Sequence, residues 1–230
     1  MDKKKRIKGK KDFDKSRKKE LYWIIGAILI LAAVFFISYF AFNNFNNFQY
    51  NGLSFTRERF GDIPVFHHYY FFNYGGETYK YNLFLRKDPR KNAVPMTGRA
   101  VENGVEFTLG NNVYVSVDPN GLVGCEYGAV GISQLSSFLA DNQLKVEGAS
   151  PIKEIADELN VSYATCNTNP LDTVVIIKGG DETSVDYVRN NCAIISIAQC
   201  QVLEAIEKFQ VKAVLDARAR ANARNNKTNV

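Results

Sequence analysis

The chain has 230 residues, of which 46% are hydrophobic and 23% are charged, as in an ordinary globular protein. Its formal net charge is +5, but residues 1–20 alone hold eleven Lys/Arg and four Asp/Glu, which leaves 18 basic and 20 acidic residues elsewhere. The bulk of the chain therefore lacks the basic surface of a nucleic-acid-binding protein, and we expect no nucleic-acid partner.

An uncharged segment follows the basic tail. Residues 21–42 contain no Asp, Glu, Lys or Arg, and a helix of 22 residues, at ~1.5 Å per residue, spans the ~30 Å core of a bilayer. Tyr22, Trp23 and Tyr39 sit where interfacial aromatic residues are common. A cleaved signal peptide is the main alternative, but its apolar region would be shorter. Its cleavage site also needs two small residues separated by one position, and Tyr39, two positions before Ala41, is large. We predict an uncleaved transmembrane signal anchor.

The charges that flank this segment predict its orientation. The basic tail, residues 1–20, precedes the segment, and the Phe/Asn-rich linker at residues 43–54 has no charge. The positive-inside rule then places the tail in the cytoplasm and the rest of the chain outside the membrane. The expected partners are the lipid bilayer and other membrane or envelope proteins.

Residues 55–217 are predicted to form one extracytoplasmic domain with a β-rich N-terminal part. Aromatic runs on both sides of Tyr74-Gly75-Gly76-Glu77 predict a β-hairpin within residues 65–87. A second hairpin is predicted from the arms Val105–Leu109 and Val113–Val117, with a turn at residues 110–112.

The second half of this domain mixes helices and strands. Apolar periodicity predicts a helix near residues 128–142, and Ser150 and Pro151 are the expected N-cap and first residue of a short helix that Asn160 ends. β-branched runs predict further strands, and an amphipathic pattern predicts a long C-terminal helix. The expected fold is α/β or α+β, a mixed sheet with two to three helices. The strands are expected at residues 173–180, 183–190 and 193–198, with a turn at Asn190-Asn191 between the last two, the long helix at 199–221, and a basic, disordered end at 218–230.

All four cysteines, Cys125, Cys166, Cys192 and Cys200, follow the uncharged segment. An even number in a non-cytosolic domain predicts disulfides. If residues 193–198 form a strand, its two flanking cysteines lie ~20 Å apart, beyond the ~7 Å that a disulfide allows between Cα atoms. Of the two connectivities left, we prefer Cys166 with Cys192 and Cys125 with Cys200, because parallel strands would bring the first pair to one end of the sheet.

Other chemistry is weakly indicated. Cys200, before a helix, is a candidate redox thiol, but no Cys-x-x-Cys is present. His67 and His68 are adjacent, so a strand points them to opposite faces, and no metal site or cofactor is expected. The catalytic residues stay unknown. Four carboxylates could serve a hydrolase: Glu126, Asp181, Glu182 and Asp186. Two asparagines match the N-glycosylation sequon: Asn160 and Asn226.

The single anchor, together with "FLRKDPRKNAVP", "YATC", "TVVIIKGGDETSV" and "NCAIISIAQCQVLEAIEKF", resembles uncharacterised membrane-anchored proteins of small-genome archaea. The resemblance covers residues 78–215 and implies an archaeal surface setting, with no activity attached. The sequence thus predicts a binding or structural protein of the cell envelope. The alternative is an envelope enzyme, either a thiol-disulfide protein or a carboxylate-based hydrolase.

Overall fold

A computed structural model describes residues 22–40, 46–108 and 110–228. The chain divides into two compact units, Met1–Phe48 and Gln49–Val230, which are described separately. The basic tail predicted at residues 1–20 lies outside the described residues.

The first unit contains the helix Tyr22–Phe40. Its mean hydropathy is 2.5, none of it is buried, and it is long and apolar enough to cross a membrane. Its length and composition fit both a membrane anchor and a signal sequence.

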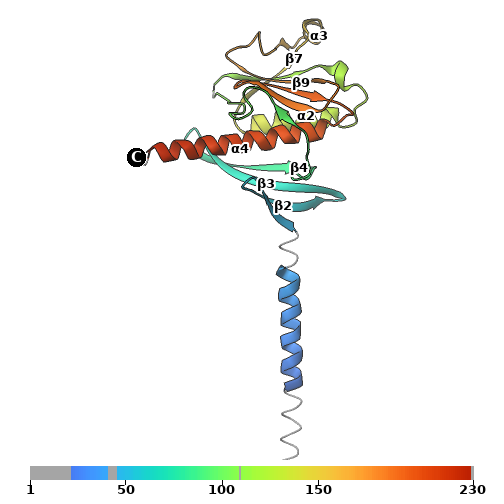
Figure 1. Ribbon diagram of the computed structural model, residues 1–230, viewed down its shortest axis with the longest axis vertical. Coiled ribbons are helices and arrows are strands. Elements are labelled where there is room, and N and C mark those ends of the chain that lie inside the picture. Colours follow the sequence, from blue (N-terminus) through green and yellow to red (C-terminus); the bar gives the residue numbers. More distant parts are fainter. Residues whose placement is uncertain (1–21, 41–45, 109, 229–230) are drawn as a thin grey trace, which may run out of the picture. The chain divides into compact units, whose positions relative to one another are not determined.

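A four-stranded sheet of consecutive strands follows, in the order β1-β2-β3-β4 (Figure 1). β2 pairs antiparallel with β3, and β3 with β4. The predicted hairpin is confirmed, since Tyr74 pairs with Glu77 across Gly75-Gly76, and both glycines have the positive φ that a tight hairpin turn requires. The strands are β1 Asn47–Tyr50, β2 Leu53–Phe60, β3 Ile63–Tyr74 and β4 Glu77–Leu85.

The linker predicted at residues 43–54 is partly wrong. The structure already has strand β1 from Asn47, and β2 begins at Leu53. Leu53 and Phe55 are buried, so the apolar side chains of this segment fold with the domain.

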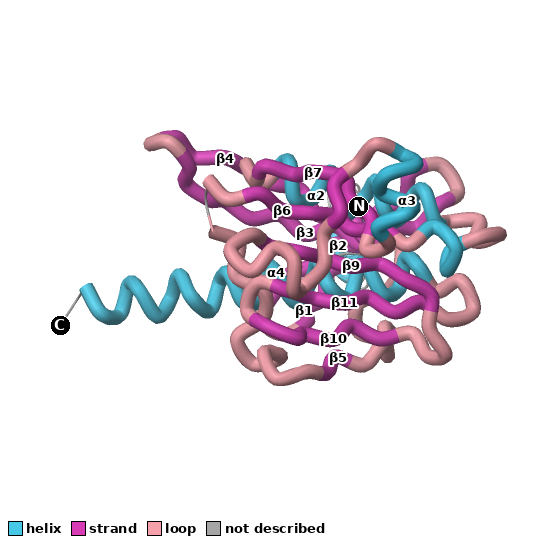
Figure 2. The backbone as a smooth tube through the Cα atoms, turned by 90° about the horizontal axis from the view of Figure 1, so that it is seen from above, coloured by secondary structure: helices cyan, strands magenta, loops and turns pink. Residues whose placement is uncertain are grey.

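A second, seven-stranded mixed sheet has the order β5-β10-β11-β9-β6-β7-β8, and Figure 2 shows most of these strands side by side. β11, β9, β6, β7 and β8 run parallel, whereas β10 and β11 form an antiparallel hairpin across the predicted Asn190-Asn191 turn. The strands are β5 Met96–Thr97, β6 Asn112–Val117, β7 Lys145–Ser150, β8 Ser162–Tyr163, β9 Thr173–Gly179, β10 Ser184–Arg189 and β11 Cys192–Ile197.

The second predicted hairpin is wrong. β6 lies between β7 and β9 and pairs in parallel with both, so neither of its edges is free for an antiparallel arm. Residues 105–108 form no strand, and Leu109, the end of the predicted arm, lies outside the described residues. Val105 is nevertheless buried, which explains why this segment reads as apolar in the sequence.

Helices α2 and α4 lie between the two sheets (Figure 1). α2 approaches α4 closely at Gly131, where a Cβ atom would lie 2.8 Å from a methyl of Val202. Phe209 of α4 stacks on Tyr187 of β10 with ring centroids 6.2 Å apart. The helical segments are the 3-10 turn η1 Pro119–Leu122, α2 Gly128–Asp141, α3 Lys153–Leu159 and α4 Val202–Thr228.

The start of the short helix α3 is a correction. Its N-cap is Ile152 and not Ser150, because Ser150 ends β7 and its Oγ accepts a hydrogen bond from the Ile152 amide at 3.2 Å. Asn160 ends the helix in the left-handed conformation, as predicted.

The basic end at 218–230 is also helical as far as Thr228 and not disordered, so that prediction is wrong for the described residues. Arg218 donates to the carbonyl of Gly52 at 2.6 Å, and Arg220 donates to the carbonyls of Asn103 and Val105 at 2.9 and 3.2 Å. These tertiary contacts hold a helix whose composition alone looks like a solvated tail.

Candidate functional site

The second unit has a groove of about 680 Å³ between strand β3 and the C-terminal half of α4. We call it the β3–α4 groove. Its walls are mostly aromatic and aliphatic, with a few polar groups. The lining residues are Leu53, His68, Tyr69, Tyr70, Phe71, Phe72, Asn73, Phe107, Phe138, Asn142, Leu144, Ala213, Val214, Ala217, Arg218 and Ala221. Tyr69 and Phe71 border the groove along β3, but strand alternation turns their side chains to the other face of the sheet.

The groove arises from unequal side chains on facing elements. Strand alternation directs Tyr70 and Phe72 of β3 to one face of the sheet. On α4, Ala213, Ala217 and Ala221 recur every four residues, so they share one face of the helix. Large rings opposite single methyl groups leave room for a ligand.

One end of the groove is held by a polar contact between two distant segments. The Tyr70 hydroxyl donates to Asn142 Oδ1 at 2.8 Å, and Asn142 Nδ2 donates to the carbonyl of Phe138 at 2.7 Å. Burial raises the pKa of Tyr70 well above its usual value, so the hydroxyl stays protonated at neutral pH. The aromatic wall is therefore neutral and fixed in place.

Among the lining residues described, Arg218 is the only one with a formal charge at neutral pH. It donates to a backbone carbonyl, that of Gly52, and no ion pair with a carboxylate is found for it in the described residues. His68 lies close to the carbonyl of Ser54, with Nδ1 at 2.8 Å, and burial lowers the pKa of its imidazole. A neutral His68 leaves one positive charge beside an apolar groove.

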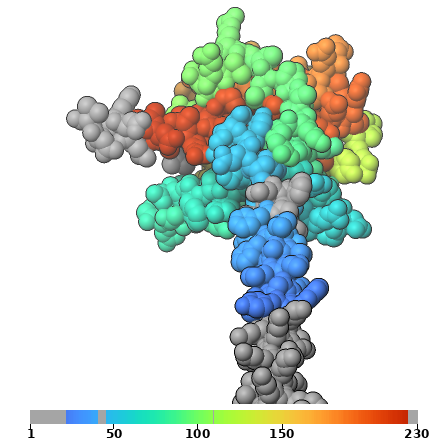
Figure 3. All heavy atoms as spheres, turned by 60° about the horizontal axis from the view of Figure 1, so that its bottom comes forward, coloured from blue at the N-terminus to red at the C-terminus, as the bar shows by residue number. Residues whose placement is uncertain are grey.

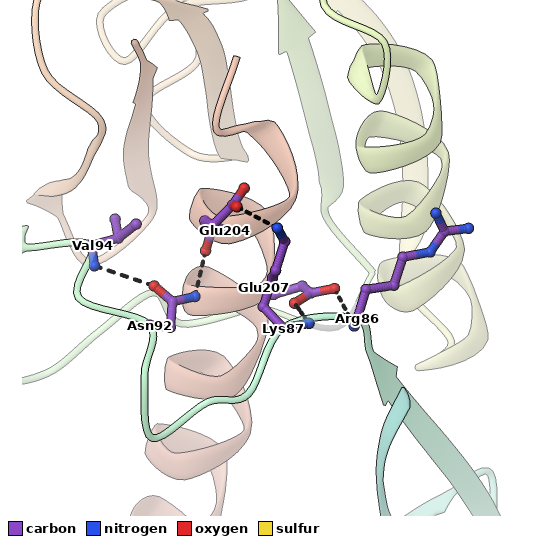
Figure 4. A network of polar contacts seen from close by, with 6 residues as sticks. All are labelled: Arg86, Lys87, Asn92, Val94, Glu204 and Glu207. Atoms are coloured by element: carbon purple, nitrogen blue, oxygen red, sulfur yellow. Dashed lines mark hydrogen bonds and ion pairs between the residues drawn. The ribbon is translucent and has the colours of Figure 1, made fainter. Parts of the chain in front are cut away.

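A polar network fixes α4 against the segment after β4 (Figure 4). Glu207 is buried, and its carboxylate accepts backbone hydrogen bonds from Arg86 at 2.6 Å and Lys87 at 2.9 Å. Lys87 Nζ also pairs with Glu204 at 2.7 Å, and Asn92 Nδ2 donates to the Glu204 carbonyl. Burial raises the pKa of Glu207 to about 7. These contacts hold α4, which forms one wall of the groove.

The four cysteines form two disulfides, Cys125–Cys200 and Cys166–Cys192, with Cα atoms 5.1 and 5.6 Å apart. These are the two pairs preferred from the strand geometry. Cys192 begins β11 beside Val174 of the parallel strand β9, which is the arrangement used in that argument. Cys200 therefore has no free thiol to act as a nucleophile.

The adjacent histidines lie on opposite faces of β3. His67 contacts Glu58 Oε1 at 2.7 Å and stacks on Phe84, whereas His68 packs on Phe55 with ring centroids 5.3 Å apart. Only His68 lines the groove. Within the described residues, no group of three His, Cys, Asp or Glu side chains could hold a metal ion.

The other predicted positions lie apart from the groove. Three of the four candidate carboxylates are exposed, and the fourth, on β10, accepts a hydrogen bond from Thr97 at 3.4 Å. The sequon residue that ends α3 is exposed, and the other lies near the end of α4. These positions are Glu126, Asp181, Glu182 and Asp186, then Asn160 and Asn226.

Comparison with protein-family models, with curated protein sequences and with solved structures finds no match for this chain. The resemblance to membrane-anchored archaeal proteins stays a prediction. Function is therefore inferred from the geometry of the second unit.

Sequence reasoning assigned no ligand role to the groove residues. In the sequence, the aromatic run around Tyr70 indicates only a hairpin strand, and Arg218 belongs only to the basic end at 218–230. The four-residue spacing of Ala213, Ala217 and Ala221 is the one local signal that could have indicated an open helix face.

Proposed function

We propose that this chain is a single-pass membrane protein of the cell envelope whose outer domain binds an amphiphile with an anionic end in the β3–α4 groove. The basic tail before the apolar helix supports a cytoplasmic N-terminus, and the two disulfides suit an oxidising compartment for the domain. Association with other envelope proteins belongs to the same proposal.

The observation that carries the proposal is the composition of the groove. Its volume of about 680 Å³ is typical of small-molecule sites, which combine apolar walls with a few placed polar groups. Arg218 at this site offers donors in a fork that matches a carboxylate or a phosphate. Since no carboxylate lines the groove in the described residues, an anionic end is favoured over a cationic one.

The enzyme alternative has less support. Its thiol candidate, Cys200, is bonded to Cys125. Its candidate carboxylates Glu126, Asp181, Glu182 and Asp186 are absent from the lining of the groove. A binding role needs neither group.

The test is photolabelling of the full chain in lipid nanodiscs with a 16-carbon fatty acid that carries a diazirine, followed by peptide mapping. We expect labelled peptides from α4, which lies on the inner side of the four-stranded sheet and lines the groove. In the Ala217→Trp variant, which fills the groove, this labelling should fall at least about tenfold, which corresponds to ~1.4 kcal/mol of binding free energy.

Ala219→Trp is the matched control, because Ala219 is on the same helix but outside the groove lining, and its labelling should equal that of the wild type. Label in residues 22–40, which would lie in the lipid, corrects for the dose of probe. Label restricted to that helix, or label on α4 that Ala217→Trp leaves unchanged, would contradict the proposal.

A further inference from the structure

The four-stranded sheet exposes an apolar face on the side opposite α2 and α4. We call it the outer aromatic face. Figure 3, which brings the underside of Figure 1 forward, shows light-blue to teal atoms of these strands at the surface. Phe71 is 62% exposed, Phe60 56% and Tyr69 53%, so large rings are open to solvent over several strands. The face comprises Phe60, Ile63, Tyr69, Phe71 and Phe84.

The strand register gathers these side chains. Phe60 pairs with Ile63 and His67 with Phe84, so residues of β2, β3 and β4 share one face. The Phe60 and Phe84 ring centroids are 5.4 Å apart, and those of Tyr69 and Phe71 are 5.9 Å apart. The His67 ring joins the two pairs, with its centroid 4.5 Å from that of Phe84 and 6.2 Å from that of Tyr69. A connected exposed cluster marks a contact surface, whereas scattered apolar residues do not.

A cation borders the cluster. Lys80 Nζ lies 4.4 Å from the centroid of the Tyr69 ring. Aromatic and Lys side chains are both common at the level of the lipid headgroups. There the ring contacts the boundary of the acyl chains, and the ammonium group remains hydrated.

The length of the chain limits where this sheet can be. Only residues 41–46 separate the end of the helix Tyr22–Phe40 from the first strand, which begins at Asn47. A fully extended chain of that length spans at most about 25 Å. If the helix crosses a membrane, the sheet is held close to the surface of that same membrane.

We infer that the outer aromatic face rests in the headgroup region of the bilayer that holds the helix. The inference rests on the transmembrane part of the proposed function. The inner face of the sheet is covered by α2 and α4, so the outer aromatic face is the one left to meet a flat surface. A lipid surface is favoured over a second copy of the chain because the short connection holds the domain near lipid at all times.

The test uses the single tryptophan of the chain, Trp23. In a Trp23→Phe background, Phe71→Trp places a reporter on the outer aromatic face, and Leu159→Trp places one at the exposed end of α3, outside both this face and the groove lining. The full-length variants are reconstituted into phosphatidylcholine vesicles with and without bromine on the acyl chains. Thermal melting of each variant checks that it folds like the wild type.

We expect brominated lipid to remove about half or more of the Phe71→Trp fluorescence, because rings at an interface sit within the quenching range of the upper acyl carbons. The Leu159→Trp signal should change little. Equal quenching of the two variants, or none in either, would overturn the inference. A blue-shifted but unquenched Phe71→Trp emission would overturn it in favour of contact with a second copy.

An alkaline carbonate wash of the vesicles distinguishes failure of this inference from failure of the transmembrane assignment in the proposed function. If the protein stays in the vesicles and Phe71→Trp is unquenched, the outer-face inference alone fails. If the protein is washed off, both the transmembrane assignment and the inference that depends on it fail.

Discussion

The Tyr70 hydroxyl lies 2.8 Å from Asn142 Oδ1, although 72 residues separate the two in sequence. Tyr70 belongs to β3 of the four-stranded sheet, and Asn142 directly follows α2, which packs on the seven-stranded sheet. This hydrogen bond therefore joins the two layers at one end of the β3–α4 groove. Removal of the hydroxyl tests how much the contact stabilises the domain.

Tyr70→Phe should lower the free energy of unfolding by about 1 kcal/mol, because it deletes a part-buried hydrogen bond and leaves Asn142 Oδ1 without its donor. Tyr187→Phe is the matched control. The Tyr187 hydroxyl is buried and has no hydrogen-bond partner in the part of the chain that the structure describes, so its removal should be neutral or stabilising. Urea denaturation measures both changes, and the reverse order of effects would contradict the assignment.

The disulfides predict two different losses of stability. Cys166 and Cys192 are 26 residues apart, and Cys125 and Cys200 are 75 apart. In the chain-entropy model, replacement of a pair by serines costs up to about 3.5 kcal/mol for the shorter loop and about 4.5 kcal/mol for the longer one. Denaturation of the two double-serine variants checks the order, and a non-reducing peptide map checks that the other bridge remains. A bridge between Cys192 and Cys200 in that map would refute the strand geometry.

Glu207 predicts a pH dependence of stability. Burial raises its pKa to about 7, so the folded state keeps a proton that the unfolded chain releases near pH 4.5. The resulting stabilisation is complete below about pH 4.5 and is lost as the pH rises through 7, a change of up to about 3 kcal/mol. The amide variant Glu207→Gln should lack this component when unfolding is measured between pH 4.5 and 8.

Glu204→Gln is the control for that measurement, because Glu204 lies one turn away and is partly exposed in its pair with Lys87. It should retain the pH dependence of the wild type. Identical pH profiles for the wild type and Glu207→Gln would show that the carboxyl is not held protonated.

Local sequence signals predicted β3, β4, β9, β10, β11 and the helices, but they gave no indication of β1, β5, β7 or β8 and failed where distant segments decide the structure. The runs at β9 and β11 were recognisable because β-branched residues are bounded by glycines or turn residues, and Cys192 could then be placed at a strand end. Residues 105–117 were read as a hairpin because alternation reports that a segment is buried but not which strands flank it.

The groove could not be predicted from the sequence, because local patterns do not show which distant segments come together. Tyr70 and Ala217 line the same groove only because two sheets sandwich α4, and no local pattern encodes that arrangement. Arg218 is similar, since its hydrogen bond to the Gly52 carbonyl spans 166 residues. The apolar helix and the cysteine pairs, by contrast, depend on length, charge and strand geometry, which a sequence shows directly.

The most direct test of the proposed ligand class is competition for the photolabelled groove by palmitic acid and by its methyl ester, which lacks the charge. Because Arg218 offers a charge-assisted hydrogen bond, the full-length wild type should prefer the acid by about tenfold. Arg218→Gln should lose that preference, while Arg220→Gln, whose guanidinium binds backbone carbonyls outside the groove lining, should keep it. Equal competition by acid and ester in the wild type would contradict an anion-selective groove.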